Sequence, residues 1–297
     1  MKGHITDKKK KSEKKGAVKR IFLGALLIGI GALILGGCGS STEETQSEQE
    51  KTASAKKEDD KIQIGLTVDS FVIERWIRDR DVFVATAREM GADVNVQDAG
   101  ADAKEQISQI EYFISKQVDV IVVIARDCGA LSDVIQKAQN AGIPVISYDR
   151  MINNSNTNLY ISFDNRKVGE IMAQALIDAI PQGGDIFMIQ GSSTDNNVHM
   201  LKKGFDDVLK NSDLNVVYEA NCEGWMAELA EGYMEEALEK YPHVKGIMCG
   251  NDDIASQVVE VLAENQMAGD VIVVGQDGDL AACQRIVEGT QYMTAFK

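Results

Sequence analysis

Two side chains of opposite charge, Asp149 and Arg150, stand next to each other directly after an apolar run. Residues 143–147 have the short apolar pattern of a buried strand, and Tyr148 closes it. In open α/β sheets, ligands bind beyond the carboxyl ends of the strands, which is where this pattern places the pair. A carboxylate and a guanidinium there offer an acceptor and a rigid fork of donors to a polyhydroxy ligand. A structural ion pair at a strand end is the alternative, and these residues alone leave both readings open.

The two tryptophans of the chain also follow predicted strands. Trp76 comes after the strand predicted at residues 62–68, and Trp225 after the one predicted at residues 215–219. An aromatic face can pack against the C–H face of a sugar ring and leave the ring edge free for hydrogen bonds. The alternative is that each tryptophan fills the core of its own domain. Their matching positions at strand exits favour stacking on a ligand.

Amides and carboxylates gather at three further strand exits, at residues 195–197, 251–253 and 276–277. Each group precedes a predicted helix, so one residue of each is expected to cap that helix. Capping leaves a surplus of side chains in every loop. Asn and Asp present the mixed donors and acceptors that sugar hydroxyls require.

The elements that must position these loops repeat as strand and helix from residue 61 onward. Nearly continuous apolar strands predict parallel sheets that are covered on both faces. Strands are predicted at residues 62–68, 94–96, 118–124, 143–147, 159–163, 185–189, 215–219, 244–249, 271–274 and 291–296. Helices are predicted at residues 74–90, 103–116, 130–140, 167–180, 198–209, 226–241, 254–266 and 280–288. The pattern predicts an α/β fold of two parallel-sheet domains joined by a hinge.

The N-terminal residues read as an export signal followed by a tether. Residues 1–37 carry a Lys-rich start, an apolar run and a Leu-Gly-Gly sequence before Cys38, which resembles a bacterial lipobox. Residues 38–60 are polar and have no hydrophobic periodicity. We therefore expect a domain on the outer face of the cell membrane, anchored there by a lipidated Cys38. An uncleaved membrane anchor is the alternative.

Charge and motifs exclude several classes of function. The formal net charge is −15, and it becomes −22 without the first 37 residues, which carry a net +7. So acidic a surface repels nucleic acid. Glycine-rich nucleotide loops, nucleophile elbows and zinc or calcium patterns are absent from the sequence, so we expect no cofactor, no metal and no enzymatic activity. Four cysteines follow Cys38, namely Cys128, Cys222, Cys249 and Cys283. Disulfides are possible among them, although a buried free thiol is the simpler account of Cys249.

Long motifs carry a resemblance to a known family. They are Glu74-Arg75-Trp76, Asp79-Arg80-Asp81, residues 148–153 and 160–165, Asp195-Asn196-Asn197, Asn251-Asp252, Gly275-Gln276-Asp277 and Gly289-Thr290. On these motifs, residues 61–297 resemble the D-xylose-binding proteins of bacterial ABC sugar importers, which have the type I periplasmic-binding-protein fold.

The resemblance implies a set of sugar-binding residues. Arg75 and Arg150 would donate to sugar oxygens, with Asp149 accepting beside Arg150. The sugar ring would lie between the aromatic faces of Trp76 and Trp225. Hydroxyls would be bound from the second domain by Asn197, Asn251 and Asp277. Lys297 would approach the site at a hinge crossing. Glu74 is a weaker candidate that holds Arg75.

The implied organisation is an N-terminal lobe at residues 61–163, a C-terminal lobe at 164–293, and the start of a return hinge crossing at 294–297. Family members continue beyond that point. The resemblance therefore implies a missing C-terminal part, and we expect residues 1–297 alone to fold poorly or to expose apolar surface on the first lobe.

The implied function is that of a monomeric receptor that binds D-xylose between two lobes and delivers it to an ABC permease. A sensor that signals to a membrane histidine kinase is the alternative, and an enzyme acting on sugars ranks third. The sequence leaves open the choice among xylose, arabinose, ribose and glucose.

Overall fold

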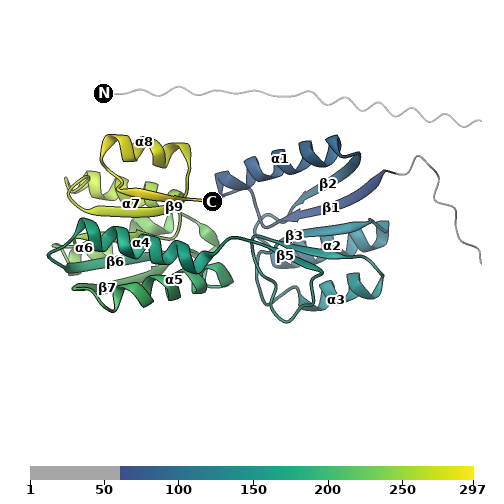
Figure 1. Ribbon diagram of the computed structural model, residues 1–297, viewed down its shortest axis with the longest axis horizontal. Coiled ribbons are helices and arrows are strands. Elements are labelled where there is room, and N and C mark those ends of the chain that lie inside the picture. The colour runs from purple at the N-terminus through teal and green to yellow at the C-terminus, as the bar shows by residue number, and fades with distance from the viewer. Residues whose placement is uncertain (1–60) are drawn as a thin grey trace, which may run out of the picture. The chain divides into compact units, whose positions relative to one another are not determined.

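The computed structural model describes residues 61–297, which form two lobes (Figure 1). The predicted signal, the lipidation at Cys38 and the predicted tether lie outside the described residues. Within residues 61–297, none of the helices has the length and apolar character needed to cross a bilayer.

The first lobe is a five-stranded parallel sheet with the strand order β2-β1-β3-β4-β5. Helices follow its first three strands, and β4 leads to β5 through a loop. Its elements are β1 (Ile62–Val68), α1 (Glu74–Glu89), β2 (Ala92–Asp98), α2 (Ala103–Lys116), β3 (Val120–Ile124), α3 (Ser132–Asn140), β4 (Val145–Tyr148) and β5 (Leu159–Ile161).

The second lobe is also a five-stranded parallel sheet, with the order β10-β9-β8-β6-β7. The chain enters it after β5, through the segment that leads to α4 (Figure 1). Its elements are α4 (Asn165–Ala179), β6 (Gly184–Gln190), α5 (Asn196–Leu209), β7 (Leu214–Asn221), α6 (Leu229–Lys240), β8 (Gly246–Cys249), α7 (Asp252–Glu264), β9 (Ile272–Asp277), α8 (Leu280–Glu288) and β10 (Met293–Phe296). Two parallel α/β lobes are thus confirmed.

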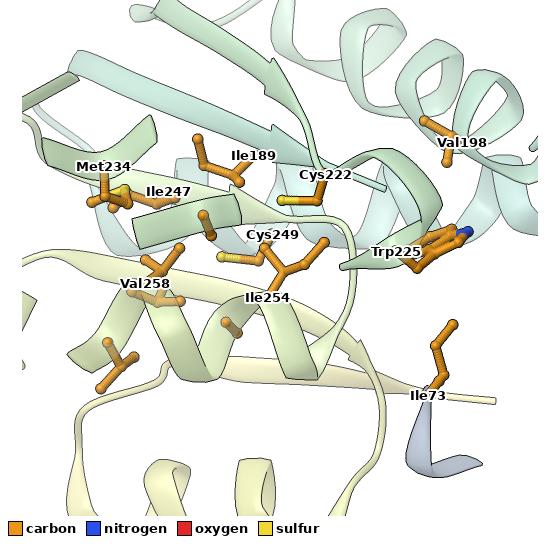
Figure 2. Packing of buried hydrophobic residues seen from close by; sticks show 14 of the residues in the cluster. Ile73, Ile189, Val198, Cys222, Trp225, Met234, Ile247, Cys249, Ile254 and Val258 are labelled. Atoms are coloured by element: carbon orange, nitrogen blue, oxygen red, sulfur yellow. The ribbon is translucent and has the colours of Figure 1, made fainter. Parts of the chain in front are cut away.

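Apolar side chains on both faces of the strands build the cores that the sequence pattern predicts. In the first lobe, Phe113 of α2 lies against Gly65 of β1, where a Cβ atom would collide with the phenyl ring. In the second, one cluster combines α4, α5 and the strands beneath them, with Met172, Leu201 and Phe205 almost fully buried. A larger cluster runs through β6, β8, α6 and α7 to Trp225 and continues into the first lobe at Ile73 and Trp76 (Figure 2). Besides this shared cluster, each lobe has an apolar core of its own, around Phe113 in the first and around Phe205 in the second, that can hold its strand-end loops in place.

Glycines set the close crossing of α4 and α5. A Cβ atom on Gly204 would collide with the backbone carbonyl of Arg166, and one on Gly169 with that of Leu201. A backbone contact of this kind leaves little freedom to relax, because a helix would have to move as a whole. The small residues therefore fix the distance between the two helices.

We expect Gly204→Ala to lower the free energy of unfolding by about 1–3 kcal/mol, because overpacking displaces α4 from α5. Gly232 of α6 is the matched control, since nothing lies within 4 Å of a Cβ atom placed there. Gly232→Ala should raise the same free energy by about 0.5–1 kcal/mol through better helix propensity. Urea denaturation of both variants measures the two changes. Equal effects in the two variants would contradict the packing account.

Most predicted elements are present with small shifts in their ends, and one helix begins later than expected. The helix predicted at residues 226–241 begins at Leu229, after a 3₁₀ turn at Glu223–Trp225. Gly224 and Trp225 in that turn have positive φ angles of 68° and 61°. Hydrophobic periodicity carries no signal for such a turn. The turn projects Trp225 from the end of the strand.

The first lobe exposes apolar side chains along α1. Val82 is 66% exposed and Met90 is 80% exposed, and they line a groove that also reaches Ile62 of β1. On the second sheet, α4 and α5 together cover one face. The face of the first lobe next to α1 is therefore less completely covered.

All four cysteines of the described region are free thiols, and Cys222 and Cys249 are buried.

Candidate functional site

A cavity lies between the two lobes, at the carboxyl ends of their strands. All of the predicted binding residues except Asn251 line it, together with Ile73, Asp195 and Gln276. The predicted residues that line it are Arg75, Trp76, Asp149, Arg150, Asn197, Trp225, Asp277 and Lys297. Six separate segments thus converge, as expected where the carboxyl ends of parallel strands face one another.

Arg75 connects the two lobes through carboxylates. Its Nη2 atom lies 2.5 Å from Asp149 and 3.3 Å from Asp79, both in the first lobe. Its Nη1 atom lies 3.7 Å from Asp277 in the second lobe. Burial works against the charge of Arg75, but the three carboxylates outweigh it and raise the pKa of the guanidinium. Arg75 is therefore a fixed cation in the cavity wall.

Asp149 is the acceptor that the sequence predicts beside Arg150. Burial alone would raise its pKa, but Lys297 and Arg75 lower the pKa below its ordinary value. Asn197 of the second lobe donates from Nδ2 to Oδ1 of Asp149 at 2.7 Å. An ionised carboxylate of the first lobe thus meets an amide of the second.

Arg150 is held by two carboxylates that the sequence-based site did not include. Its Nη1 atom donates to Asp69 at 2.6 Å and to the carbonyl of Ala125 at 3.0 Å, and its Nε atom lies 2.7 Å from Asp195. Burial opposes the charge, yet Asp195 and Asp69 raise the pKa of Arg150. Asp69 directly follows β1, so the strand-exit rule that selected Asp149 could also have found it.

Both predicted tryptophans reach the cavity. Trp76 lies in the first turn of α1, and Trp225 lies in the turn after β7, within the apolar cluster that both lobes share (Figure 2). The guanidinium of Arg150 lies 5.5 Å from the ring centroid of Trp76 and 5.8 Å from that of Trp225. The two indoles are buried in this shared cluster, so each also serves apolar packing. The reading as ligand platforms and the reading as core residues are therefore compatible.

Several buried polar atoms of the cavity wall have no hydrogen-bond partner among the described residues. They are a donor, Nε1 of Trp76, and two amide acceptors, Oδ1 of Asn197 and Oε1 of Gln276. Oδ1 of Asp277 also lacks a hydrogen bond, although Lys297 and Arg75 lie within ion-pair distance of it. Most buried polar groups in proteins are paired, so a set of unpaired ones around one cavity indicates a polar ligand. The mixture of donors and acceptors suits hydroxyl groups, which both donate and accept.

The far end of the cavity is closed by Lys297 and Asp277. The Nζ atom of Lys297 lies 3.5 Å from Oδ1 of Asp277 and 4.2 Å from the ring centroid of Phe163. Phe163 lies in the segment that connects the lobes, so Lys297 contacts both that segment and the second lobe. The predicted approach of this lysine to the site is present in the structure.

Asn251 and Glu74 lie outside the cavity wall. Asn251 caps α7, its Oδ1 atom accepting from the backbone of Ile254 at 2.9 Å. The capping alternative accounts for Oδ1, whereas Nδ2 is buried without a hydrogen-bond partner among the described residues, and Asn251 is not part of the cavity wall. Glu74 pairs with Arg78 at 3.5 Å rather than with Arg75.

Three further carboxylates lie near Asp277: Asp252 and Asp253 at the start of α7, and Asp279 at the start of α8. Burial, together with the neighbouring carboxylates of Asp279 and Asp277, raises the pKa of Asp253 to about 6. Oδ2 of Asp253 has no hydrogen-bond partner in the described part of the chain. The folded protein therefore disfavours the charged form of this side chain.

Asp253→Asn should raise the free energy of unfolding by about 1–3 kcal/mol at pH 8. The pKa of Asp253 is higher in the folded state than its ordinary value of 3.8, so the charged carboxylate destabilises the fold fully above pH 6. This destabilisation disappears as the pH falls from 6 towards 4, because the carboxyl group becomes protonated. The gain from the substitution then disappears as well. Urea denaturation at pH 8, 6 and 4 measures this. Asp133→Asn, at the second position of α3 and exposed, is the matched control; a gain at pH 4 equal to that at pH 8 would contradict the charge penalty.

The volume between the lobes is small. The cavity measures about 20 Å³, enough for about one water molecule, and an adjoining one beside Phe163 and Lys297 measures about 190 Å³. The wall groups bind one another across the cavity, as Arg75, Asp149 and Asn197 do.

Within residues 61–297, no group of three or more His, Cys, Asp or Glu side chains could hold a metal ion.

The sequence of this chain is similar to those of known binding proteins. The sequence model of the family described as "Periplasmic binding protein domain" matches residues 64–297. The chain is 42% identical over 241 residues to the D-xylose-binding periplasmic protein of Haemophilus influenzae, covering 80% of this chain and 72% of that protein. It is 41% identical over 241 residues to the D-xylose-binding periplasmic protein of Escherichia coli, covering 80% and 73%.

Among solved structures, one similar to this chain is a periplasmic solute-binding protein of an ABC transporter from Actinobacillus succinogenes with bound D-allose. The TM-score is 0.73 and the sequence identity 28%, and the match covers 78% of this chain and 84% of that one. The two-lobed architecture is therefore shared with a protein whose structure contains a monosaccharide.

Proposed function

The chain belongs to the periplasmic binding protein family, and on that premise we propose that it binds D-xylose between its two lobes and delivers it to an ABC permease. Its relatives are substrate-binding proteins, and the chain is likewise a binding protein rather than an enzyme. Identity above 40% to two D-xylose-binding proteins supports the choice of sugar.

The observation that carries the proposal is the composition of the cavity wall. Two indoles, one from each lobe, line the cavity; Nε1 of Trp76 and two buried amide acceptors beside it lack partners among the described residues. Aromatic faces bind the C–H face of a pyranose, and mixed polar groups bind its hydroxyls. A phosphate or an ammonium ligand would not use both kinds of group.

We further propose that the sugar enters between separated lobes and is enclosed when they close. The cavity of about 20 Å³ is smaller than a sugar ring, so the cross-lobe contacts of Arg75 and Asn197 have to open. Sugar hydroxyls would then replace those protein partners. A ligand that touches both lobes favours the closed arrangement by its differential affinity, which is how closure can signal occupancy to a permease.

The location of the receptor forms part of the proposal. A lipidated Cys38 would hold a monomeric receptor at the outer face of the cell membrane, with residues 38–60 as the tether. The lipobox-like residues before Cys38 support the anchor. Membrane fractionation of a Cys38→Ser variant tests it, since the variant should leave the membrane fraction.

Isothermal titration calorimetry with xylose, arabinose, ribose and glucose tests the proposed ligand. The proposal expects one site per chain and tighter binding of xylose than of the other three sugars. Tighter binding of a hexose would keep the family and overturn the sugar. Absence of heat with all four sugars would overturn the sugar-binding function itself.

A further inference from the structure

Asp195 is a cavity residue whose two carboxylate oxygens both bind protein groups. It follows β6 at the start of α5 and is only 3% exposed. Oδ1 accepts from the backbone N–H of Asn197 at 2.9 Å. Oδ2 accepts from Nε1 of Trp225 at 3.2 Å and lies 2.7 Å from Nε of Arg150. One oxygen therefore holds an indole of its own lobe and a guanidinium of the other lobe.

We propose that Asp195 is a positioning residue that couples closure of the two lobes to the orientation of the Trp225 indole. The inference rests on the proposed function, because it concerns the same cavity. It gives Asp195 a role through Trp225 and Arg150, without a contact to the sugar.

The indole of Trp225 depends on a few contacts for its orientation. The backbone of Trp225 has a φ angle of 61°, which costs about 1 kcal/mol or more for a residue with a side chain. The six-membered ring of the indole lies close to Gly191, where a Cβ atom would collide with it. The hydrogen bond from Nε1 to Asp195 is the polar contact that fixes the ring edge. Loss of that bond therefore frees the ring to turn.

Arg150 reaches Asp195 from a fixed position in the first lobe. Asp69 and the carbonyl of Ala125 hold its Nη1 atom at 2.6 and 3.0 Å. Because this anchor belongs to the first lobe, the guanidinium meets Asp195 only when the lobes are together. Closure then adds a charge-assisted bond to the oxygen that already accepts from Trp225. The position of the lobes and the orientation of the indole are thus linked through one atom.

The test uses the two tryptophans of the chain, which give two indole N–H signals in a ¹⁵N NMR spectrum. A Trp76→Phe variant assigns them. In Asp195→Asn, without sugar, we expect the Trp225 signal to shift and the Trp76 signal to stay in place. We also expect the affinities for xylose, arabinose and glucose to fall by one common factor of about 10 to 100, since a lost charged bond weakens closure for every ligand. The matched control is Asp102→Asn, which removes a carboxylate from the cap of α2 and should change neither signal nor affinity.

A second variant covers the case in which Asp195→Asn does not fold. Asp69→Asn weakens the contact that holds Arg150 in the first lobe, and it removes no atom of Asp195 or Trp225. The proposal expects the Trp225 signal to move in this variant too, although residue 69 does not touch the indole. An unchanged Trp225 signal in the folded variants would overturn the proposal.

The affinity measurements separate a positioning role from a direct contact. A loss confined to one sugar would show that Asp195 touches the ligand and would overturn the proposal. If no sugar binds the unsubstituted protein, the proposed function fails, and the two indole signals still decide the role of Asp195.

Discussion

Arg150→Met is expected to lower the free energy of unfolding by about 3–5 kcal/mol and to abolish sugar binding. The substitution leaves the buried Asp195 without a cation and leaves Asp69 with Arg126 alone, at 3.5 Å, and an unpaired buried charge is far more costly than an absent ion pair. The side chains of all three residues are at most 3% exposed, so solvent does little to relieve the two carboxylates. Urea denaturation measures the stability and calorimetry the binding.

Arg166→Met is the matched control for this prediction. Arg166 pairs with Asp207 at 2.7 Å, but its side chain is 52% exposed. Surface pairs of this kind contribute about 0–1 kcal/mol. A loss below 1 kcal/mol in Arg150→Met, similar to that of the control, would contradict the account of Arg150 as the centre of a buried network.

Trp76→Leu is expected to weaken xylose binding about 30-fold or more, which corresponds to about 2 kcal/mol. Leucine keeps an apolar side chain in the wall but removes the flat aromatic face and the unpartnered Nε1 donor. Calorimetry measures the affinity, and circular dichroism checks that the variant remains folded. Tyr112→Leu, an exposed aromatic of α2, should leave the affinity unchanged. Unaltered xylose affinity in a folded Trp76→Leu variant would show that Trp76 serves the core alone.

The sequence predicted the two sheets and the edge at which the site lies. Continuous apolar strands determine the first, and the rule for the carboxyl ends of parallel strands determines the second. The rule selects loops, and it brought Trp76, Asp149 and Trp225 to one cavity from widely separated positions. These residues were predictable because residue type and topological level carry the signal.

The pairing of side chains within the site was not predictable in the same way. Asp195 was read with its loop as a helix cap, which it is, but its second oxygen also reaches Arg150 and Trp225. That contact depends on how the two lobes meet, which leaves no periodic mark in the sequence. Asn251 is the opposite case, because the rule selected its loop, yet it caps α7 and does not line the cavity.

Intrinsic tryptophan fluorescence of the protein during titration with xylose tests the central claim most directly. Both tryptophans line the cavity, so a sugar bound there changes the surroundings of each. The account predicts a saturable change with xylose that reaches half its amplitude at a lower concentration than with arabinose, ribose or glucose, and that shifts to higher concentration in Trp76→Leu. A flat response to all four sugars, with no heat in calorimetry, would contradict the claim that the cavity between the lobes is a sugar site.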